Sequence, residues 1–66
     1  MKNKLVLRFT WKDADPEFIE LYNVNKIDVY IDTEKADFFF YRIECDGRFY
    51  YFAKSRTTIE SFEILQ

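Results

Sequence analysis

The sequence has no histidine and only one cysteine (Cys45), one glycine (Gly47) and one proline (Pro16) among its 66 residues. A single cysteine cannot form a disulfide within the chain, and a Cys/His zinc site is excluded because histidine is absent. Nucleophilic catalysis of the usual kinds is not expected, since no imidazole can activate Cys45. One glycine is too few for a phosphate-binding loop. We therefore expect no enzymatic activity and no cofactor.

Long apolar segments are also missing. No apolar run approaches the ~20 residues that a membrane-spanning helix needs, so no membrane association is expected. No apolar segment typical of a secretion signal follows Met1, and a lone cysteine fits a reducing compartment, which together predict a cytoplasmic location. The length predicts one domain, residues 1–66. A domain of this size buries only roughly 60% of its unfolded surface, so it needs additional burial from aromatic side chains or self-association.

The charges are unevenly distributed, although the net charge is only −2. Residues 1–12 contain four basic side chains and no acid, whereas residues 13–37 contain eight acids and two lysines. One interpretation is a solvated surface, and the other is an acidic patch for a basic partner. Asp13, Asp15 and Glu17 alternate and could contact a cation, but a calcium loop needs more oxygen ligands and a glycine. We interpret this segment as an acidic turn and expect no metal site.

Residues 38–54, FFFYRIECDGRFYYFAK, predict a β-hairpin. Asp46-Gly47 is the preferred pair for a two-residue type I′ turn, in which both residues have positive φ. Aromatic and β-branched residues on both sides favour strands. With this turn, Cys45 lies opposite Arg48, and the pairs outward from them follow by counting.

The alternation of side chains then gives the hairpin two different faces. The more apolar face is predicted to lie in the core, and its residues are Phe39, Tyr41, Ile43, Cys45, Tyr50 and Phe52. The opposite face combines aromatic rings with charges, and we call it the mixed face: Phe40, Arg42, Glu44, Phe49, Tyr51 and Ala53. Exposed aromatic patches usually mark interfaces, so Phe40, Arg42, Phe49 and Tyr51 are the predicted binding residues.

Alternating segments elsewhere predict further strands. Residues 4–11 place Leu5, Leu7, Phe9 and Trp11 on one side. Residues 27–32 place Ile27, Val29 and Ile31 inward and Asp28, Tyr30 and Asp32 outward. Residues 18–22 fit a strand, but Asp15, Pro16 and Glu17 also fit the start of a short helix over 16–22. We favour the strand.

A short pattern recurs 35 positions apart: apolar-x-x-apolar-acid-apolar, at Val24–Val29 and at Ile59–Ile64. It suggests two halves, each with the order strand–strand–turn–strand. The repeat favours a strand at residues 57–65, whereas Thr57 and Glu60 also fit a helix capping box. The predicted fold is therefore all-β, a small antiparallel barrel or two-layer sandwich of five to six strands centred on the 38–54 hairpin. The alternative is α+β, with a short helix at 16–22, at 57–65 or at both.

The segment DGRFYYFAKSRTTIESFEIL resembles part of the small phage inhibitors of uracil-DNA glycosylase, in which a DG turn, a YY pair and a later FE–aliphatic–L also occur. In that family, the aromatic and acidic residues that match Phe62 and Glu63 belong to a helix that meets the target. The resemblance implies that Phe62 and Glu63 contact a protein partner, and that the chain inhibits a DNA-processing enzyme.

We therefore expect a non-enzymatic protein–protein interaction module, a phage-type regulator or inhibitor of a host protein, that forms a homodimer through the mixed face. One alternative is a single-stranded nucleic-acid binder, because Arg42 beside Phe49 and Tyr51 combines positive charge with stacking planes. The negative net charge weakens this alternative. The other alternative is inhibition of uracil-DNA glycosylase.

Overall fold

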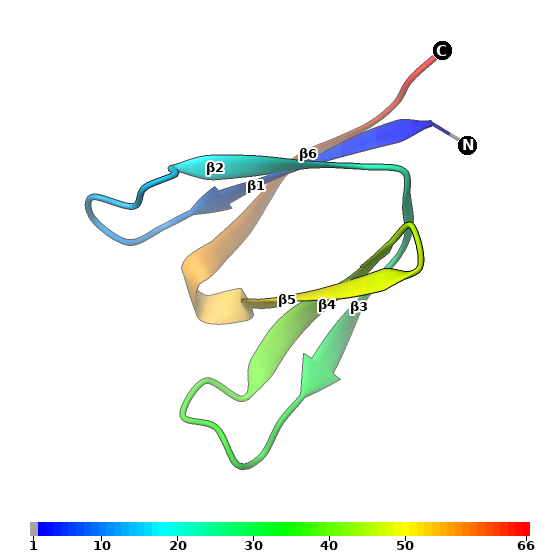
Figure 1. Cartoon of the computed structure of the whole chain (residues 1–66). Coiled ribbons are helices and arrows are strands. Elements are labelled where there is room, and N and C mark those ends of the chain that lie inside the picture. The colour runs from blue at the N-terminus through cyan, green and yellow to red at the C-terminus, as the bar shows by residue number, and fades with distance from the viewer. Residues whose placement is uncertain (1) are drawn as a thin grey trace.

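The computed structural model describes residues 2–66 as six strands in two three-stranded antiparallel sheets (Figure 1). Sheet A has the order β2-β1-β6 and sheet B the order β3-β4-β5. The two layers are not closed into a barrel, so the sandwich is the correct member of the predicted pair. The elements are β1 (Asn3–Phe9), β2 (Phe18–Tyr22), β3 (Val24–Ile31), β4 (Phe39–Cys45), β5 (Arg48–Ala53), a 3-10 turn η1 (Lys54–Arg56) and β6 (Thr57–Ile64).

The hairpin prediction is confirmed in position and register. Strands β4 and β5 pair from Cys45 opposite Arg48 outward to Phe40 opposite Ala53. The φ angles of Asp46 and Gly47 are 52° and 76°, as a type I′ turn requires. The aspartate accepts this left-handed backbone better than most side chains do, and glycine accepts it without steric cost.

Both helical alternatives are wrong. Residues 18–22 pair with β1, and residues 57–64 pair with the other side of β1. The central strand β1 thus pairs with a strand on each edge. Residues 18–22 and 57–64 make their backbone hydrogen bonds to β1, and not within short helices. Short helices are marginal without tertiary support, so pairing outweighs the local helix-start signals at Pro16 and Thr57.

The chain passes between the sheets at two places, which lie on opposite sides of the sandwich in Figure 1. One is the turn η1, between β5 and β6. The other is a sharp corner at Asn23, where β2 ends and β3 begins with no intervening loop. Asn23 has φ 59°, a left-handed conformation that asparagine tolerates. Strands β2 and β3 are therefore consecutive segments of one path that belong to different sheets.

The side chain of Asn3 holds this corner. Its Oδ1 accepts a hydrogen bond from the Val24 N–H at 2.8 Å, and its Nδ2 donates to the Val24 carbonyl at 2.9 Å. The Asn3 carbonyl accepts from the Asn23 N–H at 3.1 Å, and the Cys45 thiol donates to the Tyr22 carbonyl. Asn3 is only 3% exposed. The backbone N–H and C=O groups at the corner between β2 and β3 are thus hydrogen-bonded although they lie between the two sheets. Buried polar groups require such partners.

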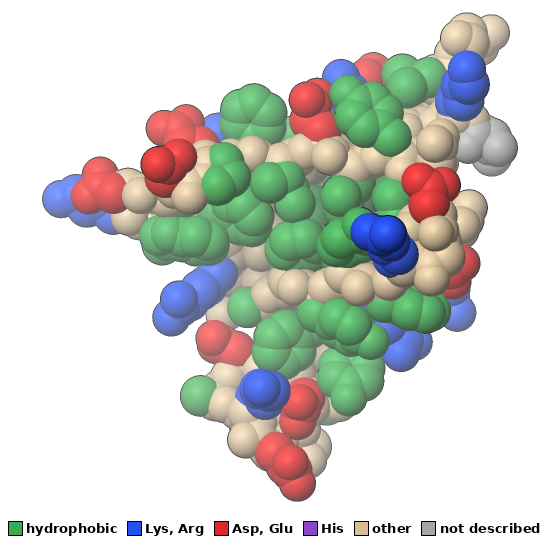
Figure 2. All heavy atoms as spheres, viewed as in Figure 1, with side chains coloured by type: hydrophobic (Ala, Val, Ile, Leu, Met, Phe, Trp, Pro, Cys, Tyr) green, Lys and Arg blue, Asp and Glu red, His purple; other side chains and the backbone are tan. Residues whose placement is uncertain are grey.

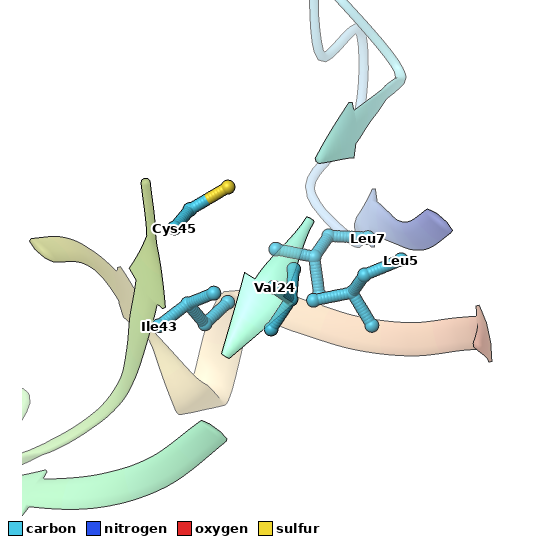
Figure 3. Close-up of a cluster of buried hydrophobic side chains, with 5 residues drawn as sticks. All are labelled: Leu5, Leu7, Val24, Ile43 and Cys45. Carbon is cyan, nitrogen blue, oxygen red and sulfur yellow. The ribbon is translucent and has the colours of Figure 1, made fainter. Parts of the chain in front are cut away.

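The core is small. Figure 3 shows Ile43 and Cys45 pointing from β4 toward Val24 and the two leucines of β1, and Leu5, Leu7 and Ile43 are fully buried. Flanking side chains are half-buried against this cluster: Ile19, Leu21, Tyr41, Tyr50 and Phe52.

Several side chains predicted to lie inward are nevertheless exposed. These are Trp11 (46%), Ile27 (37%), Val29 (47%), Ile31 (57%) and Phe39 (49%). They lie on the inward-facing sides of their strands, or beyond the end of β1 for Trp11, where the opposite sheet does not cover them. Alternation predicts the side of a strand correctly but does not predict how far the other layer extends.

The sequence repeat corresponds to a structural one. In each half, two strands pair as a hairpin and the third crosses to the hairpin of the other half, so that β3 pairs with β4 and β6 with β1. Each crossing strand contains a bulge at the same position of the pattern, Asn25 in β3 and Glu60 in β6. An apolar-x-x-apolar spacing breaks strict alternation, and one extra residue restores it, which is the effect of a β-bulge.

We expect Gly47→Val to lower the free energy of unfolding by roughly 1–3 kcal/mol, because a β-branched residue is strained at positive φ. A Cβ at this position would meet no atom within 4 Å, so the cost is backbone strain alone. Asp46→Asn is the control and should be nearly neutral, since asparagine also accepts this conformation. Urea unfolding followed by circular dichroism measures both. A Gly47→Val variant as stable as the parent would contradict the turn geometry.

We expect Asn3→Ala to destabilise the fold by about 2–4 kcal/mol, because it leaves the buried N–H and C=O of Val24 without partners. Asn3→Asp should also be harmful, since a carboxylate next to the Val24 carbonyl cannot donate. Asn25→Ala is the matched control, because Asn25 is exposed and its side chain makes one long hydrogen bond of 3.5 Å. Thermal melts of the three variants should separate Asn3 from Asn25, and equal melting temperatures would disprove the role of the corner.

Candidate functional site

The mixed face is the side of sheet B that points away from sheet A. The observed register brings together the predicted residues Phe40, Arg42, Phe49 and Tyr51 on this side. Strand β3 adds Lys26, Asp28 and Tyr30, because Asp28 pairs with Arg42 and Tyr30 with Phe40. Figure 2 shows hydrophobic side chains both between the two layers and over the lower layer, where acidic and basic groups lie among them.

Arg42 is the centre of this face and is held in place by Asp28. Its Nε donates to Asp28 Oδ1 at 3.0 Å and its Nη2 donates to Asp28 Oδ2 at 2.8 Å, a bidentate pair. The two side chains are only 34% and 28% exposed. The hydrogen bonds from Arg42 lower the pKa of Asp28, and the same hydrogen bonds raise the pKa of Arg42. Both groups therefore stay charged at neutral pH.

Aromatic rings surround the guanidinium. It lies 5.7 Å from the centre of the Tyr30 ring and 5.9 Å from that of Phe49, within the range of cation–π attraction. Tyr51 meets Tyr30 edge-on, with ring centres 5.4 Å apart. These rings remain accessible: Tyr30 is 38% exposed, Tyr51 49% and Phe49 54%. The face is thus ordered by internal contacts while its rings remain open to a partner.

The charges of this face balance. Lys26 and Arg42 are opposed by Asp28 and Glu44, and these four with Phe49 line a shallow hollow of about 180 Å³. A surface without excess positive charge attracts phosphates poorly, because affinity for a nucleic-acid backbone comes from cations that are not neutralised by the protein itself.

A larger hollow of about 360 Å³ lies elsewhere, between the start of β4 and η1. Its polar groups are occupied by internal contacts. Ser55 donates to Asp37 at 3.1 Å, and the Lys54 ammonium lies 5.8 Å from the centre of the Tyr41 ring. We therefore regard the mixed face as the better candidate site, although its hollow is smaller.

Phe62 and Glu63 are not part of the mixed face. Both lie on β6, in sheet A, so the helix implied by the resemblance to the glycosylase inhibitors is wrong. Phe62 is on the inward side and 48% exposed, and Glu63 forms an ion pair with Lys4 at 3.2 Å. The structure thus separates them from the other four predicted binding residues.

The remaining candidates offer little chemistry. Cys45 is 7% exposed and burial raises the pKa of its thiol, so it is poorly suited to act as a nucleophile. Within residues 2–66, no group of three or more acidic or cysteine side chains is arranged to hold a metal ion. No helix in the same range has the length and hydropathy needed to cross a membrane.

The sequence prediction missed Asp28 and Tyr30 as members of the site. It placed both outward on their strand, but the partner of that strand was unknown. The sequence contained a signal for this pairing, because Asp28 and Arg42 are opposite charges at outward positions of two strands, and such charges favour cross-strand pairing. The loop of residues 32–38 between the strands is too long for its sequence to fix the register.

We expect the contribution of the Asp28–Arg42 pair to stability to depend on pH. Because the pKa of Asp28 is lowered in the folded protein, the pair stabilises the fold above the unfolded-state pKa of about 4 and loses this effect as the pH falls through the folded-state value. Asp28→Asn should therefore be less stable than the parent at neutral pH, and the difference should shrink below about pH 4. Urea unfolding across this range measures it, and a constant difference would contradict the assignment.

No known protein family, curated protein or solved structure matches this chain.

Proposed function

We propose that this protein is a non-enzymatic interaction module that binds another protein through the mixed face of sheet B. The main support for this proposal is the environment of Arg42. Its side chain is held by the ion pair with Asp28, and the accessible rings of Tyr30, Phe49 and Tyr51 surround it. Arginine, tyrosine and phenylalanine are enriched in protein–protein interfaces, and tyrosine and arginine are frequent hot spots. Because the side chains of this face are already held by internal contacts, they lose little conformational entropy when a partner binds.

The size of the surface supports this proposal. A compact monomer of this mass is expected to expose about 4,500 Å², whereas this chain exposes 5,012 Å². Its radius of gyration is 12.3 Å, compared with about 11 Å expected for a globular domain of this length. The excess surface includes many large hydrophobic side chains, and burial by a partner would remove part of it from water.

The proposed role is that of a small regulator or inhibitor of a host protein. Such a role needs an ordered surface and no chemistry, which agrees with a face whose polar groups are already paired. Single-stranded nucleic acid remains an alternative ligand, but Asp28 and Glu44 neutralise the cations beside the rings. The absence of a helix at Phe62 and Glu63 weakens the case for inhibition of uracil-DNA glycosylase.

The test is quantitative capture of proteins from a bacterial lysate, with nuclease present, by the immobilised chain and by variants. Tyr51→Ala and Phe49→Ala should each weaken binding of the same partner by about 30-fold, the loss expected for an interface hot spot. Phe18→Ala is the matched control: Phe18 is 44% exposed in sheet A and, like Phe49, lies near an arginine, Arg8. Its binding should be unchanged.

Two further measurements decide between the alternatives. Binding of oligo-dT at low salt that falls steeply with added salt and is weakened by Tyr51→Ala would replace the proposal with nucleic-acid binding. Inhibition of purified uracil-DNA glycosylase that is lost in Glu63→Gln would favour the resemblance instead. Equal capture by the parent, Tyr51→Ala and Phe49→Ala would overturn the role of the mixed face.

A further inference from the structure

A second surface borders the mixed face: the free edge of β3. Strand β3 is one of the two outer strands of sheet B and pairs only with β4. Among residues 2–66, no backbone hydrogen bond is made to the other edge of residues 25–31. An exposed row of unpaired N–H and C=O groups can pair with another strand.

The same strand has an apolar strip that its own protein leaves uncovered. Ile27, Val29 and Ile31 point to the inward side of sheet B and are 37%, 47% and 57% exposed. Phe39 of β4 pairs with Ile31 and is 49% exposed. A strand added at this edge would form hydrogen bonds with the free backbone groups of β3 and would also cover these apolar side chains.

The other crossing strand is less suited to this. Strand β6 has its bulge at Glu60, in the middle of the strand, and a bulge disrupts regular pairing. In β3 the bulge is at Asn25, next to the corner, so residues 26–31 form a regular edge. This leaves β3 as the longer uninterrupted edge of the two.

We propose that β3 pairs with β3 of a second copy of this chain, antiparallel, about a two-fold axis at Val29. In this register Val29 faces Val29 of the second copy, and Ile27 faces Ile31 on both sides of the axis. Lys26 faces Asp32 of the second copy, also twice. All cross-strand pairs of the inward side are apolar, and the outermost pairs have opposite charges, both of which favour pairing.

The neighbouring registers are less favourable. Those that keep the inward sides of both copies together centre on a single residue. Centring on Asp28 places it opposite Asp28, and centring on Tyr30 places Asp28 opposite Asp32, which are like-charge pairs. Centring on Ile27 sets Val29 against the bulged Asn25 and moves the second copy toward the corner. Like-charge pairs thus disfavour the registers centred on Asp28 and Tyr30, and the bulge at Asn25 disfavours the one centred on Ile27, so the Val29 register is favoured.

The resulting assembly has one continuous six-stranded sheet with the order β5-β4-β3-β3-β4-β5. The mixed faces of the two copies would lie side by side on the same surface, which doubles the area offered to a partner. This dimer differs from the one predicted from the sequence, which used the mixed face itself. It does not depend on the proposed function, because the edge of β3 and the mixed face are changed by different substitutions.

Sedimentation equilibrium of four proteins tests the proposal. The parent should dimerise, and Val29→Lys should raise the dissociation constant by about tenfold or more, because it places two lysines opposite each other at the axis. Ile64→Lys is the matched control, since Ile64 is the counterpart of Val29 in the repeat and is 53% exposed. The double variant Phe49→Lys, Tyr51→Lys should also still dimerise.

Each other outcome has a defined meaning. A parent that is monomeric at its highest soluble concentration overturns the proposal. Dissociation by the Phe49, Tyr51 double variant but not by Val29→Lys also overturns it, and assigns the dimer to the mixed face. A parent that dimerises but whose binding to a foreign partner is unchanged by Phe49→Ala and Tyr51→Ala would count against the proposed function alone.

Disulfide cross-linking tests the register without relying on a destabilising change. Val29→Cys should form a covalent dimer with oxidised glutathione, as two thiols on the axis join and glutathione is reduced. Tyr30→Cys should not, because it faces residue 28 of the second copy in this register. Ile64→Cys controls for random collision, and the native Cys45 is buried. Cross-linking of Tyr30→Cys but not Val29→Cys would overturn the register.

Discussion

The pair of hydrogen bonds between Asn3 and Val24 is the constraint on which this fold depends. The chain turns from one sheet into the other at Asn23 without a loop, and a buried corner of this kind separates backbone groups from their ladders. The side-chain amide of Asn3 supplies Val24 with the donor and the acceptor that a neighbouring strand would otherwise provide. With only a few fully buried side chains in the core, the loss of two buried hydrogen bonds cannot be offset elsewhere. The corner also sets where β3 begins, and so the pairing that joins Asp28 to Arg42.

The two halves of the chain have the same arrangement of strands. Each half forms a hairpin and gives its third strand to the hairpin of the other half, so neither sheet is made from one half alone. The bulges at Asn25 and Glu60 allow each crossing strand to enter its new sheet with its apolar side facing the core. Equivalent strands place the core residues Leu5 and Leu7 in β1 and Ile43 and Cys45 in β4.

Local signals predicted much of this structure. Asp46-Gly47 gave the turn and register of the central hairpin, and alternation gave the sides of the other strands. The fold class and the grouping of Phe40, Arg42, Phe49 and Tyr51 followed from these alone. What could not be predicted depends on contacts between distant segments: the role of Asn3, the contribution of Asp28 and Tyr30, and the exposure of Ile31 and Trp11. Alternation gives direction, whereas burial depends on the extent of the other layer. The helix that the resemblance implies at Phe62 and Glu63 is wrong, because these residues pair with β1 as part of β6, as the repeat predicted.

The pairing of β1 with β6 has a consequence for how the chain folds. Residues 3–9 bond to residues 57–64, so sheet A joins the two most distant strands of the sequence. The hairpin of β4 and β5 is local and can form early, but the central strand of sheet A lacks one of its two partners until β6 exists. Proteins dominated by such distant contacts fold slowly, commonly in milliseconds to seconds. During synthesis on the ribosome, one edge of β1 therefore remains without its partner strand until residues 57–64 emerge.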